Sequence, residues 1–546
     1  MKQDRKSDVG GNNGMLRKTM SHHWAWAVLV LILVFAGGIR YRLRDMPLER
    51  DEGEYAYMGQ LMLQGIPPYE AAYNMKFPGI YAAYAAILAV FGQTASGIRL
   101  GVLLVDAANI VLIFIIAKRM WSDLAGLMAA ATYALFTLGK GSLGLAGHAT
   151  HFVVLPALGA LLLMLHARNN RRMWPHFVMG ILLGLSVLMK QPGALYIPFF
   201  FIFPLWDELR RRPVLWKPIV HRSLSLAFGV ALALLITVFI IWRVGVFERF
   251  WFWTVSYAIT YASQVEPQHI FLVFRMGMGV VIQSTWPLWI LAAAGFVLLC
   301  FKRSDTRQLF FIATFTFFSF LAVCPAFLFR QHYFIVMMPA VAMLIGGGLS
   351  FASELLARRA ARPLAAAPIL IFLAAWGFSF YQEHVLFLKL TPPQASRHLY
   401  GTNPFPESVH VAEYIRNRTS PDDLIAVIGS EPQIYFYANR RSATGHIYTY
   451  GMMEDNPYAL KMQKEMARQI EAASPKYVVF VNIFSSWLQR PTSPTYIFDW
   501  FRNYVSSGTL EGVVELTPQG TRYTWGPDAA NAVPTTNNYL LIFRLR

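Results

Sequence analysis

Charged residues are scarce in this chain of 546 residues. Asp, Glu, Lys and Arg make up 14% of it, hydrophobic residues make up 55%, and the mean hydropathy is +0.40. In soluble domains about a quarter of the residues are charged. The scarcity therefore excludes an ordinary soluble protein and predicts an integral membrane protein.

Cysteine is also nearly absent, and the two that occur, Cys300 and Cys324, fall near opposite ends of neighbouring apolar segments. That separation is too long for a disulfide, so no disulfide framework is expected. No Gly-rich phosphate fingerprint follows the strand patterns of the C-terminal part, which disfavours a nucleotide site. No A-x-A-like site follows the first apolar segment, so we expect a retained signal anchor instead of a cleaved secretory signal.

Acidic residues are outnumbered, 30 against 48 basic ones, for a net charge of +18. Most Lys and Arg residues stand in short clusters between apolar segments, so the positive-inside rule explains them better than nucleic-acid binding does. Placing every cluster in the cytoplasm predicts about eleven spans. They cover residues 22–39, 98–117, 124–142, 150–167, 175–192, 194–207, 218–243, 279–300, 308–328, 333–350 and 364–381.

One apolar segment does not fit this predicted order of membrane crossings. "FPGIYAAYAAILAVFG", residues 77–92, is short for a span and has a proline at its start. We interpret it as an interfacial or re-entrant piece of the first outer loop. The alternative is a real span, which would put Lys118 and Arg119 outside.

The predicted organisation has three parts. A cytoplasmic tail, residues 1–21, precedes a membrane domain over residues 22–384, whose first outer loop covers residues 40–97. In residues 385–546, helix patterns such as "SVHVAEYIRNR" alternate with strand patterns such as "DDLIAVIG". We therefore expect an α-helical polytopic protein of the plasma (inner) membrane, with its N-terminus in the cytoplasm and an extracytoplasmic C-terminal α/β domain.

Carboxylates crowd into "ERDEGEYAY", residues 49–57, just after the first apolar segment. A structural explanation is a helix start, with Asp51 as N-cap and Glu54 as its partner, on an amphipathic helix that lies on the membrane surface. A chemical explanation adds Lys76, which follows on the same loop in "NMKFPGIY". A carboxylate base and a cation that holds phosphate can together catalyse group transfer from a phospholipid donor.

Five stretches together resemble the polytopic glycosyltransferases of the GT-C type. They are "RDEGEYAY", "KFPGIYAAYAAILAVFG", "IRLGVLLVDAANIVLIFIIAKRMW", "LMKQPG" and "FRQHYFIVMMP". The branch they resemble contains bacterial enzymes related to protein O-mannosyltransferases, the aminoarabinose transferase of lipid A and lipopolysaccharide core galacturonosyl transferases. Each motif is short, so their order and spacing carry the resemblance.

The resemblance implies a catalytic pair, Asp51 and Glu52, with Asp51 as the base. Lys76 matches the family lysine that contacts the donor phosphate. Relatives often place another acid in the short second outer turn, whereas "GLAGHATHFV" offers His148 and His151. We therefore expect no cofactor and do not favour a divalent metal.

Further residues are expected around this pair. Lys190, Arg330 and Tyr333 fall at outer ends of predicted spans, where they would join the donor phosphate site or simply anchor among the headgroups. We assign sugar or acceptor contacts to Glu54, Tyr55, Arg99, His148, His151 and His332. Arg99 has an alternative role, which is to pair with an acid of the first loop.

The implied reaction moves a sugar from a polyprenyl-phosphate donor to a hydroxyl of an envelope lipid, polysaccharide or protein on the outer face, with inversion. The alternative is a polytopic lipid or sugar transporter or flippase, but we find neither an inverted repeat nor charged, broken helices at mid-membrane. A non-catalytic scaffold would not explain why Asp51, Lys76 and Lys190 converge on one side. The outer part also lacks the Trp-Trp-Asp signature of oligosaccharide-transferring relatives, which disfavours en bloc glycan transfer.

Overall fold

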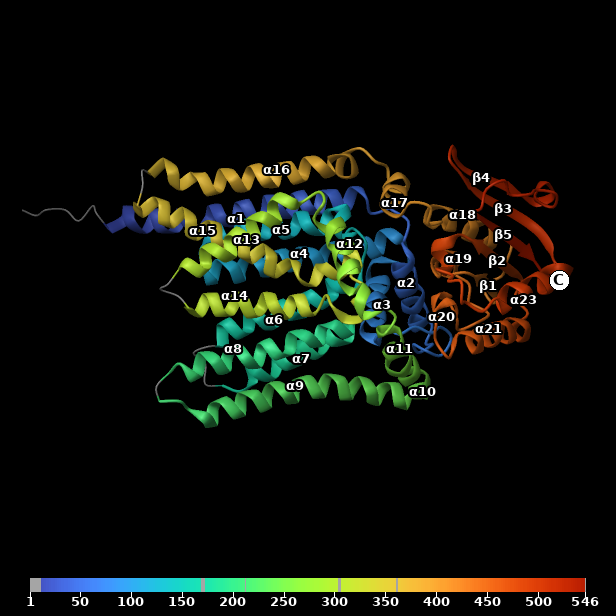
Figure 1. Cartoon of the computed structure of the whole chain (residues 1–546), viewed down its shortest axis with the longest axis horizontal. Helices are drawn as coiled ribbons and strands as arrows, with labels where there is room; N and C mark the ends of the chain where they lie inside the picture. Colours follow the sequence, from blue (N-terminus) through green and yellow to red (C-terminus); the bar gives the residue numbers. More distant parts are fainter. Residues whose placement is uncertain (1–10, 168–171, 212, 303–305, 360–361, 546) are drawn as a thin grey trace, which may run out of the picture.

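The structure, a computed structural model, describes residues 11–167, 172–211, 213–302, 306–359 and 362–545. It has two parts that lie end to end along the long axis: a bundle of helices and a smaller C-terminal domain that contains the sheet (Figure 1). Of the predicted N-terminal tail, residues 1–10 lie outside the described residues, and residues 11–21 already belong to the first helix.

Six helices in the described part of the chain are long and apolar enough to cross a membrane. They are α1 (Gly11–Arg42), α4 (Ala95–Met120), α6 (Ala149–Ala167), α9 (Trp216–Arg243), α15 (Met338–Arg359) and α16 (Ala367–Leu388). A seventh span results if the bent pair formed by Phe247–Ala262 and Pro267–Ile282 counts as one. The predicted polytopic helical fold is confirmed.

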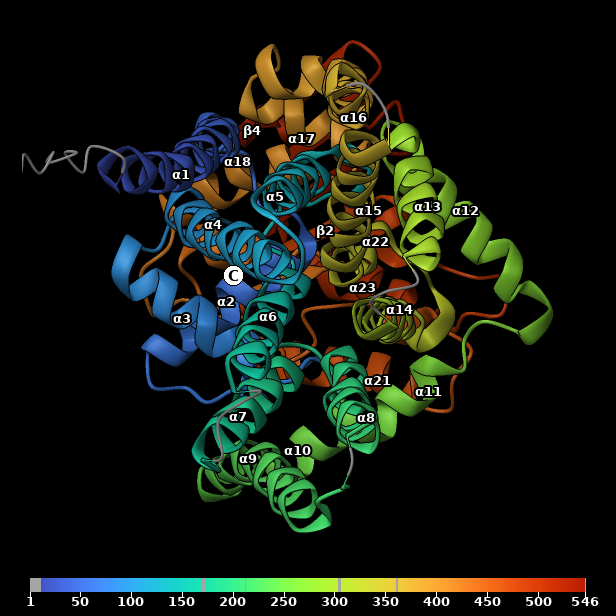
Figure 2. The ribbon, with the colours of Figure 1, turned by 90° about the vertical axis from the view of Figure 1, so that its left-hand side faces the viewer.

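Shorter apolar helices complete the bundle alongside the long ones (Figure 2). They are α5 (Asp123–Leu138), α7 (Trp174–Met189), α8 (Ile197–Leu209), α13 (Trp286–Phe301) and α14 (Thr306–Leu321). Each predicted span overlaps a helix, but several ends differ. The predicted span 279–300 contains a break, because α12 (Ile270–Ile282) ends there and Pro287 lies in the first turn of the next helix.

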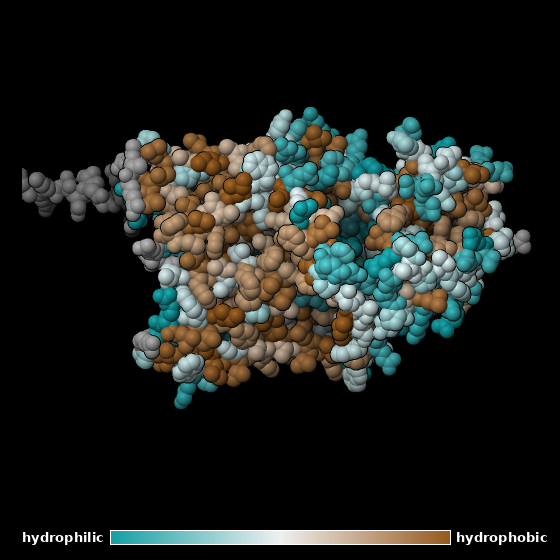
Figure 3. Space-filling view, in the orientation of Figure 1, coloured by the Kyte–Doolittle hydropathy of each residue, from teal (hydrophilic) through white to brown (hydrophobic). Residues whose placement is uncertain are grey.

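Exposed apolar side chains cover the bundle, whereas hydrophilic ones gather at its junction with the C-terminal domain and on that domain (Figure 3). Leu31, Leu224, Leu235 and Leu370, on three different helices, are each more than half exposed. A large exposed apolar surface on an otherwise well-packed bundle is the surface that lipid covers.

The apolar segment 77–92, which did not fit the predicted membrane crossings, forms α3 (Pro78–Phe91), a helix of 14 residues. At 1.5 Å per residue it is about 21 Å long, which is shorter than the ~30 Å hydrocarbon core of a bilayer. It packs against α2 (Arg50–Leu63) at the end of the bundle that carries the C-terminal domain (Figure 1). Its position at this end of the bundle agrees with the interfacial or re-entrant interpretation, which stays a prediction.

The C-terminal domain has a five-stranded sheet in the order β1-β2-β5-β3-β4. The strands are β1 (Ile425–Ile428), β2 (Tyr477–Asn482), β3 (Thr509–Thr517), β4 (Gly520–Trp525) and β5 (Tyr539–Arg544). β1 and β2 are parallel and the other neighbours are antiparallel, so the predicted α/β domain is confirmed. Its helices include α17 (Pro392–Tyr400), α18 (Phe405–Arg416), α19 (Gln433–Ala438), α20 (Tyr450–Met453), α21 (Ala459–Ala473) and α23 (Tyr496–Tyr504).

Two predictions about α2, its N-cap and its position on the membrane surface, are wrong. Its N-cap is Glu49, not Asp51, because Glu49 and Glu52 form a reciprocal capping box with each other's backbone N–H groups. It does not lie on a membrane surface either, since most of its residues are buried between the bundle and α19. The contact is close enough that a Cβ on Gly53 would lie 2.7 Å from the backbone nitrogen of Gln433.

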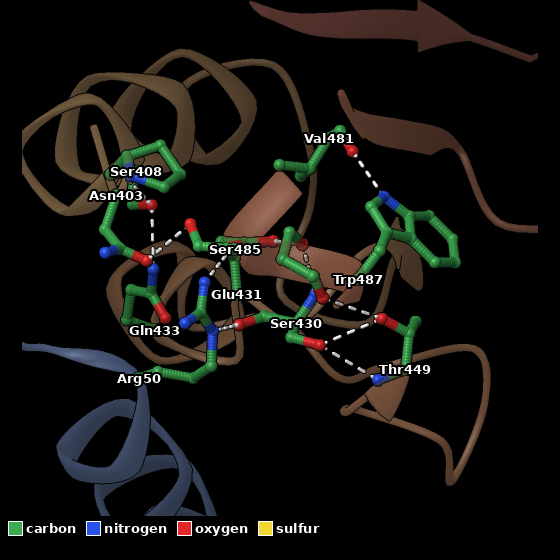
Figure 4. A network of polar contacts seen from close by, with 12 residues as sticks. Arg50, Asn403, Ser408, Ser430, Glu431, Gln433, Thr449, Val481, Ser485 and Trp487 are labelled. Carbon is green, nitrogen blue, oxygen red and sulfur yellow. Dashed lines mark hydrogen bonds and ion pairs between the residues drawn. The ribbon is translucent and has the colours of Figure 1, made fainter. Parts of the chain in front are cut away.

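A buried ion pair joins the two parts of the molecule at the start of α2 (Figure 4). The Arg50 guanidinium donates to Glu431 Oε1 over 2.7 Å and to the backbone carbonyl of Ser430. The Ser486 hydroxyl donates to the second carboxylate oxygen of Glu431 over 2.7 Å. The network therefore holds the C-terminal domain on the first outer loop.

Arg50→Ala would leave Glu431 buried without its cation. Removing one partner of a buried pair costs about 3–5 kcal/mol, so we expect a lower melting temperature in detergent and faster protease cleavage of the C-terminal domain. Arg502→Ala is the control, because Arg502 pairs with Asp499 at an exposed surface and should change little. An unchanged melting temperature for Arg50→Ala would show that the pair does not hold the two parts together.

Candidate functional site

A cavity of about 250 Å³ lies between the helical bundle and the C-terminal domain. The membrane part contributes Asp51, Lys76, Lys190, Arg330, His332 and Tyr333 to its wall, and the C-terminal domain contributes His446, Tyr448, Tyr450 and Glu454. The predicted base and all four predicted phosphate contacts are thus brought to one cavity, although they come from four separate segments of the sequence.

Asp51 stands in the first turn of α2, with its carboxylate partly exposed in the cavity. Its Oδ1 atom lies 3.2 Å from Lys76 Nζ and accepts a hydrogen bond from the Tyr448 hydroxyl over 3.0 Å. Its Oδ2 atom lies 3.8 Å from His332 Nε2. Burial alone would raise the pKa of Asp51, but Lys76 holds it well below its usual range. The carboxylate is therefore ionised at neutral pH.

Lys76 lies between two carboxylates. Its ammonium group is 3.4 Å from Glu54 Oε2 as well as 3.2 Å from Asp51, and it donates to the Tyr55 hydroxyl over 3.2 Å. Burial lowers the pKa of Lys76, but the two acids outweigh burial and raise it above the usual value. The lysine is therefore charged and faces the cavity from the first outer loop.

Glu54 is fully buried behind Lys76. The Tyr81 hydroxyl donates to its Oε1 atom over 2.6 Å. Burial raises the pKa of Glu54 to about 7, with Lys76 acting in the opposite direction. Tyr55 and Glu54 thus contact Lys76 and do not line the cavity themselves.

Lys190 and Tyr333 form one side of the cavity. Lys190 directly follows α7, and its Nζ atom lies 4.0 Å from the centre of the Tyr333 ring, a cation–π distance. Arg330 is exposed to the cavity just before the short helix Gln331–Val336, which also carries His332. With Lys76, these residues place two lysines and one arginine around one space. Burial and the nearby Lys76 lower the pKa of Lys190 to about 7, so this lysine is only partly charged at neutral pH.

Glu52 and Arg99, in contrast, lie beneath the cavity wall. Glu52 has no exposed surface, pairs with the Arg99 guanidinium and accepts from the Gly147 N–H over 2.6 Å. Arg99 also donates to the Leu145 carbonyl over 2.8 Å. The pair therefore ties the second outer turn to the first loop, which agrees with the alternative role expected for Arg99.

The two histidines of the second outer turn, His148 and His151, lie in different surroundings. His148 is buried, and its ring stacks on His332 with centroids 4.1 Å apart. His151 lies deeper, with Nδ1 3.6 Å from Asp106 Oδ1, and Asp106 pairs with Arg40 over 3.1 Å inside the bundle. His148 thus adjoins the cavity wall, whereas His151 belongs to a buried network away from it.

The residues present could hold one metal ion. Ligand atoms of Asp51, His148 and His332 all lie within 4.8 Å of one another, and imidazole with carboxylate is a donor set suited to a divalent transition metal. Lys76, at 3.2 Å from Asp51, already supplies positive charge to the same carboxylate and would repel such an ion. The expectation that the site works without a metal stays a prediction.

Residues 76–242 match the family described as dolichyl-phosphate-mannose-protein mannosyltransferase. An undecaprenyl phosphate-alpha-4-amino-4-deoxy-L-arabinose arabinosyl transferase 2 of Pseudomonas fluorescens is 28% identical over 251 residues, covering 43% of this chain and 44% of that protein. The corresponding transferase of Pseudomonas aeruginosa strain LESB58 is 31% identical over 218 residues, covering 37% of this chain and 38% of its own. The match therefore spans less than half the length of these relatives.

Solved structures are similar over nearly the whole chain. ArnT from Cupriavidus metallidurans bound to undecaprenyl phosphate has a TM-score of 0.56 at 14% identity, covering 95% of this chain and 97% of that one. The archaeal oligosaccharyltransferase AglB from Archaeoglobus fulgidus, in complex with an inhibitory peptide and a dolichol-phosphate, has a TM-score of 0.54 at 14% identity, covering 94% and 75%. The chain has the GT-C fold. The resemblance found in the sequence is confirmed.

The C-terminal domain of this GT-C chain supplies cavity residues that were not predicted from the sequence. Tyr448, Tyr450 and Glu454 reach the cavity from a loop and the short helix α20, and Tyr257 donates to Glu454 over 2.8 Å. The available signal is "GHIYTYGMMEDN", an aromatic-rich stretch that fits neither a strand nor a helix pattern. Nothing in that stretch indicates that it lies against the first outer loop.

Because Glu52 is buried beneath the cavity wall and pairs with Arg99, we expect it to position the first outer loop and not to take part in the reaction. Glu52→Gln would leave the Arg99 guanidinium buried without its anion, so we expect a loss of about 3 kcal/mol or more in stability. Asp51→Asn, at the partly exposed neighbour, should keep the wild-type melting temperature. Thermal unfolding in detergent compares the two variants. A Glu52→Gln protein that is fully stable yet inactive would instead place Glu52 among the reacting groups.

Proposed function

We propose that the chain transfers a sugar from a polyprenyl-phosphate donor to an acceptor hydroxyl on the outer face of the membrane. The observation that carries the proposal is the Asp51 carboxylate in one cavity with Lys76, Lys190 and Arg330. The relatives are named for undecaprenyl phosphate-linked aminoarabinose, and ArnT was solved with undecaprenyl phosphate. A donor of the same chemical class would suit this cavity.

The position of the cavity supports a lipid-linked donor. It lies where the apolar surface of the bundle meets the hydrophilic C-terminal domain (Figure 3). A polyprenyl chain would lie along the apolar surface, its phosphate would meet the cations at the junction, and the sugar would extend under Tyr448 and Tyr450. Lysine and arginine bind phosphate through charge-assisted hydrogen bonds.

The chemistry is a single displacement. The acceptor oxygen attacks the anomeric carbon and Asp51 takes its proton, while the bond between that carbon and the phosphate oxygen breaks. The lipid phosphate leaves with the electron pair, and Lys76, Lys190 and Arg330 stabilise its charge. Attack opposite the leaving group inverts the anomeric centre.

Donor binding would also activate the base. Lys76 holds the pKa of Asp51 low, so Asp51 is an ionised but weak base. A phosphate bound to Lys76 would offset part of the positive charge next to Asp51 and raise its pKa. Asp51 would then accept a proton more readily once the donor is in place.

Asp51→Asn removes the proton acceptor with little change in shape. Since a positioned base contributes about 10²–10⁴-fold, we expect transfer to fall by that factor while the fold and donor binding persist. The assay is turnover of radiolabelled polyprenyl-phosphate sugars by purified protein, with an envelope extract as acceptor.

Asp45→Asn is the matched control, because Asp45 lies in the same outer loop with an exposed side chain and outside the cavity wall. Equal transfer by wild type and Asp51→Asn would exclude Asp51 as the base. If the wild type transfers from none of the donors tested, the transporter alternative takes precedence.

Donor affinity should depend on pH through Glu54. Ionised Glu54 lies 3.4 Å from Lys76 Nζ and competes with a donor phosphate, and its pKa of about 7 means that it ionises as the pH rises through neutrality. Glu54→Gln removes that competitor. We expect the variant to bind undecaprenyl phosphate several-fold more tightly than wild type at about pH 8, and nearly equally at about pH 6.

At each pH the measured quantity is the affinity of Glu54→Gln divided by that of wild type. This ratio does not depend on the ionisation of the phosphate itself, which has a second pKa of about 6. Glu70→Gln is the control, since Glu70 is exposed on the same outer loop. A ratio that does not change between the two pH values would rule out Glu54 as the competing anion.

A further inference from the structure

A second cavity, of about 70 Å³, lies at the end of the bundle opposite the C-terminal domain. Helices α6, α7, α8, α9 and α14 contribute to its wall, and Figure 2 shows this end of the bundle facing the viewer. Its polar lining consists of His176, Asp207, Glu208, Arg211, Arg222, Ser223 and Arg307. We propose that this cavity binds the phosphate of an anionic phospholipid headgroup.

Among the described residues of the cavity wall, three arginines outnumber two carboxylates. Arg307 Nε lies 2.7 Å from Asp207 Oδ1, and Arg211 lies 3.2 Å from Asp207 and 3.5 Å from Glu208. Arg222 makes only a long contact, 3.8 Å from Glu208 Oε2. Three guanidinium groups therefore share two carboxylates within this wall.

Arg222 is the group that points to a ligand. Its Nε atom is buried and has no hydrogen-bond partner among the residues that the structure describes. A buried donor without an acceptor is costly, and a phosphate oxygen would satisfy it with a charge-assisted hydrogen bond. The excess of arginines over carboxylates and the unpaired donor thus favour the same kind of ligand, an oxyanion.

The rest of the wall favours a lipid over a free oxyanion. The apolar residues of the wall include Leu165, Phe201, Leu205, Ile219 and Leu226. Leu205 remains 38% exposed, on the surface of the bundle that lipid covers. A hydrocarbon chain would gain from contact with these side chains, whereas inorganic phosphate would gain only from the arginines.

The level of the cavity in the membrane agrees with this ligand. We expect this end of the bundle to face the cytoplasm, and the cytoplasmic leaflet is the one that carries anionic lipids. Basic pockets between helices on that side are sites for anionic headgroups. The cavity is remote from Asp51, so the inference does not depend on the proposed transferase reaction.

The test is titration of the delipidated full chain with phosphatidylglycerol, phosphatidylcholine or inorganic phosphate, followed by native mass spectrometry. Wild type should bind phosphatidylglycerol several-fold more tightly than phosphatidylcholine. Arg222→Gln should weaken phosphatidylglycerol binding about fivefold, the effect of one cation near a headgroup. Glu208→Gln should strengthen it, because it removes a competing anion from Arg222 and Arg211.

Arg119→Gln is the matched control, since Arg119 is an exposed cation at the end of α4, outside this cavity, and should bind lipid as wild type does. Equal affinities of wild type, Arg222→Gln and Glu208→Gln for phosphatidylglycerol would overturn the proposal. Inorganic phosphate that binds as tightly as phosphatidylglycerol would overturn the lipid assignment. If Arg222→Gln does not fold, the opposite change expected of Glu208→Gln still decides the question.

Discussion

The burial of three neighbouring carboxylates at the start of α2, those of Glu49, Glu52 and Glu54, is the constraint on which the rest of the site depends. A carboxylate out of water must find a cation or hydrogen-bond donors. Glu49 and Glu52 cap the helix, Glu52 also binds Arg99, and Glu54 binds Tyr81 and Lys76. The contacts of Glu52 with Arg99 and with the Gly147 N–H link later segments of the chain to the first outer loop, and those of Glu54 with Lys76 and Tyr81 hold that loop together.

Asp51 differs from its neighbours because it faces the cavity. The buried acids around it hold Lys76 and the second outer turn in place, so the carboxylate that we propose as the base stands on a rigid support. A preorganised charged site of this kind needs little rearrangement at the moment of reaction. The same short stretch therefore serves structure and chemistry at once, through different residues.

Each end of the bundle has a cavity lined by charged residues, and the surroundings of the two cavities differ. At one end, cations surround a cavity covered by the C-terminal domain, where Tyr448 contacts Asp51 directly. At the other, arginines and acids share a small cavity whose remaining wall is apolar. Both settings suit phosphate groups of lipids, because each joins positive charge to a surface that hydrocarbon can cover.

The membrane class, the helical segments, the α/β C-terminal part and the acidic stretch with Lys76 could be predicted from the sequence, because hydropathy, periodicity and short motifs are local properties. It misplaced the N-cap, since Asp51 and Glu49 are both acceptable caps in a linear pattern. That α2 is buried, that Glu52 lies beneath the cavity and that Tyr448 reaches Asp51 became visible in the folded chain alone. Those facts depend on contacts such as Arg50 with Glu431, between segments hundreds of residues apart, and no local pattern records which distant segment covers a helix.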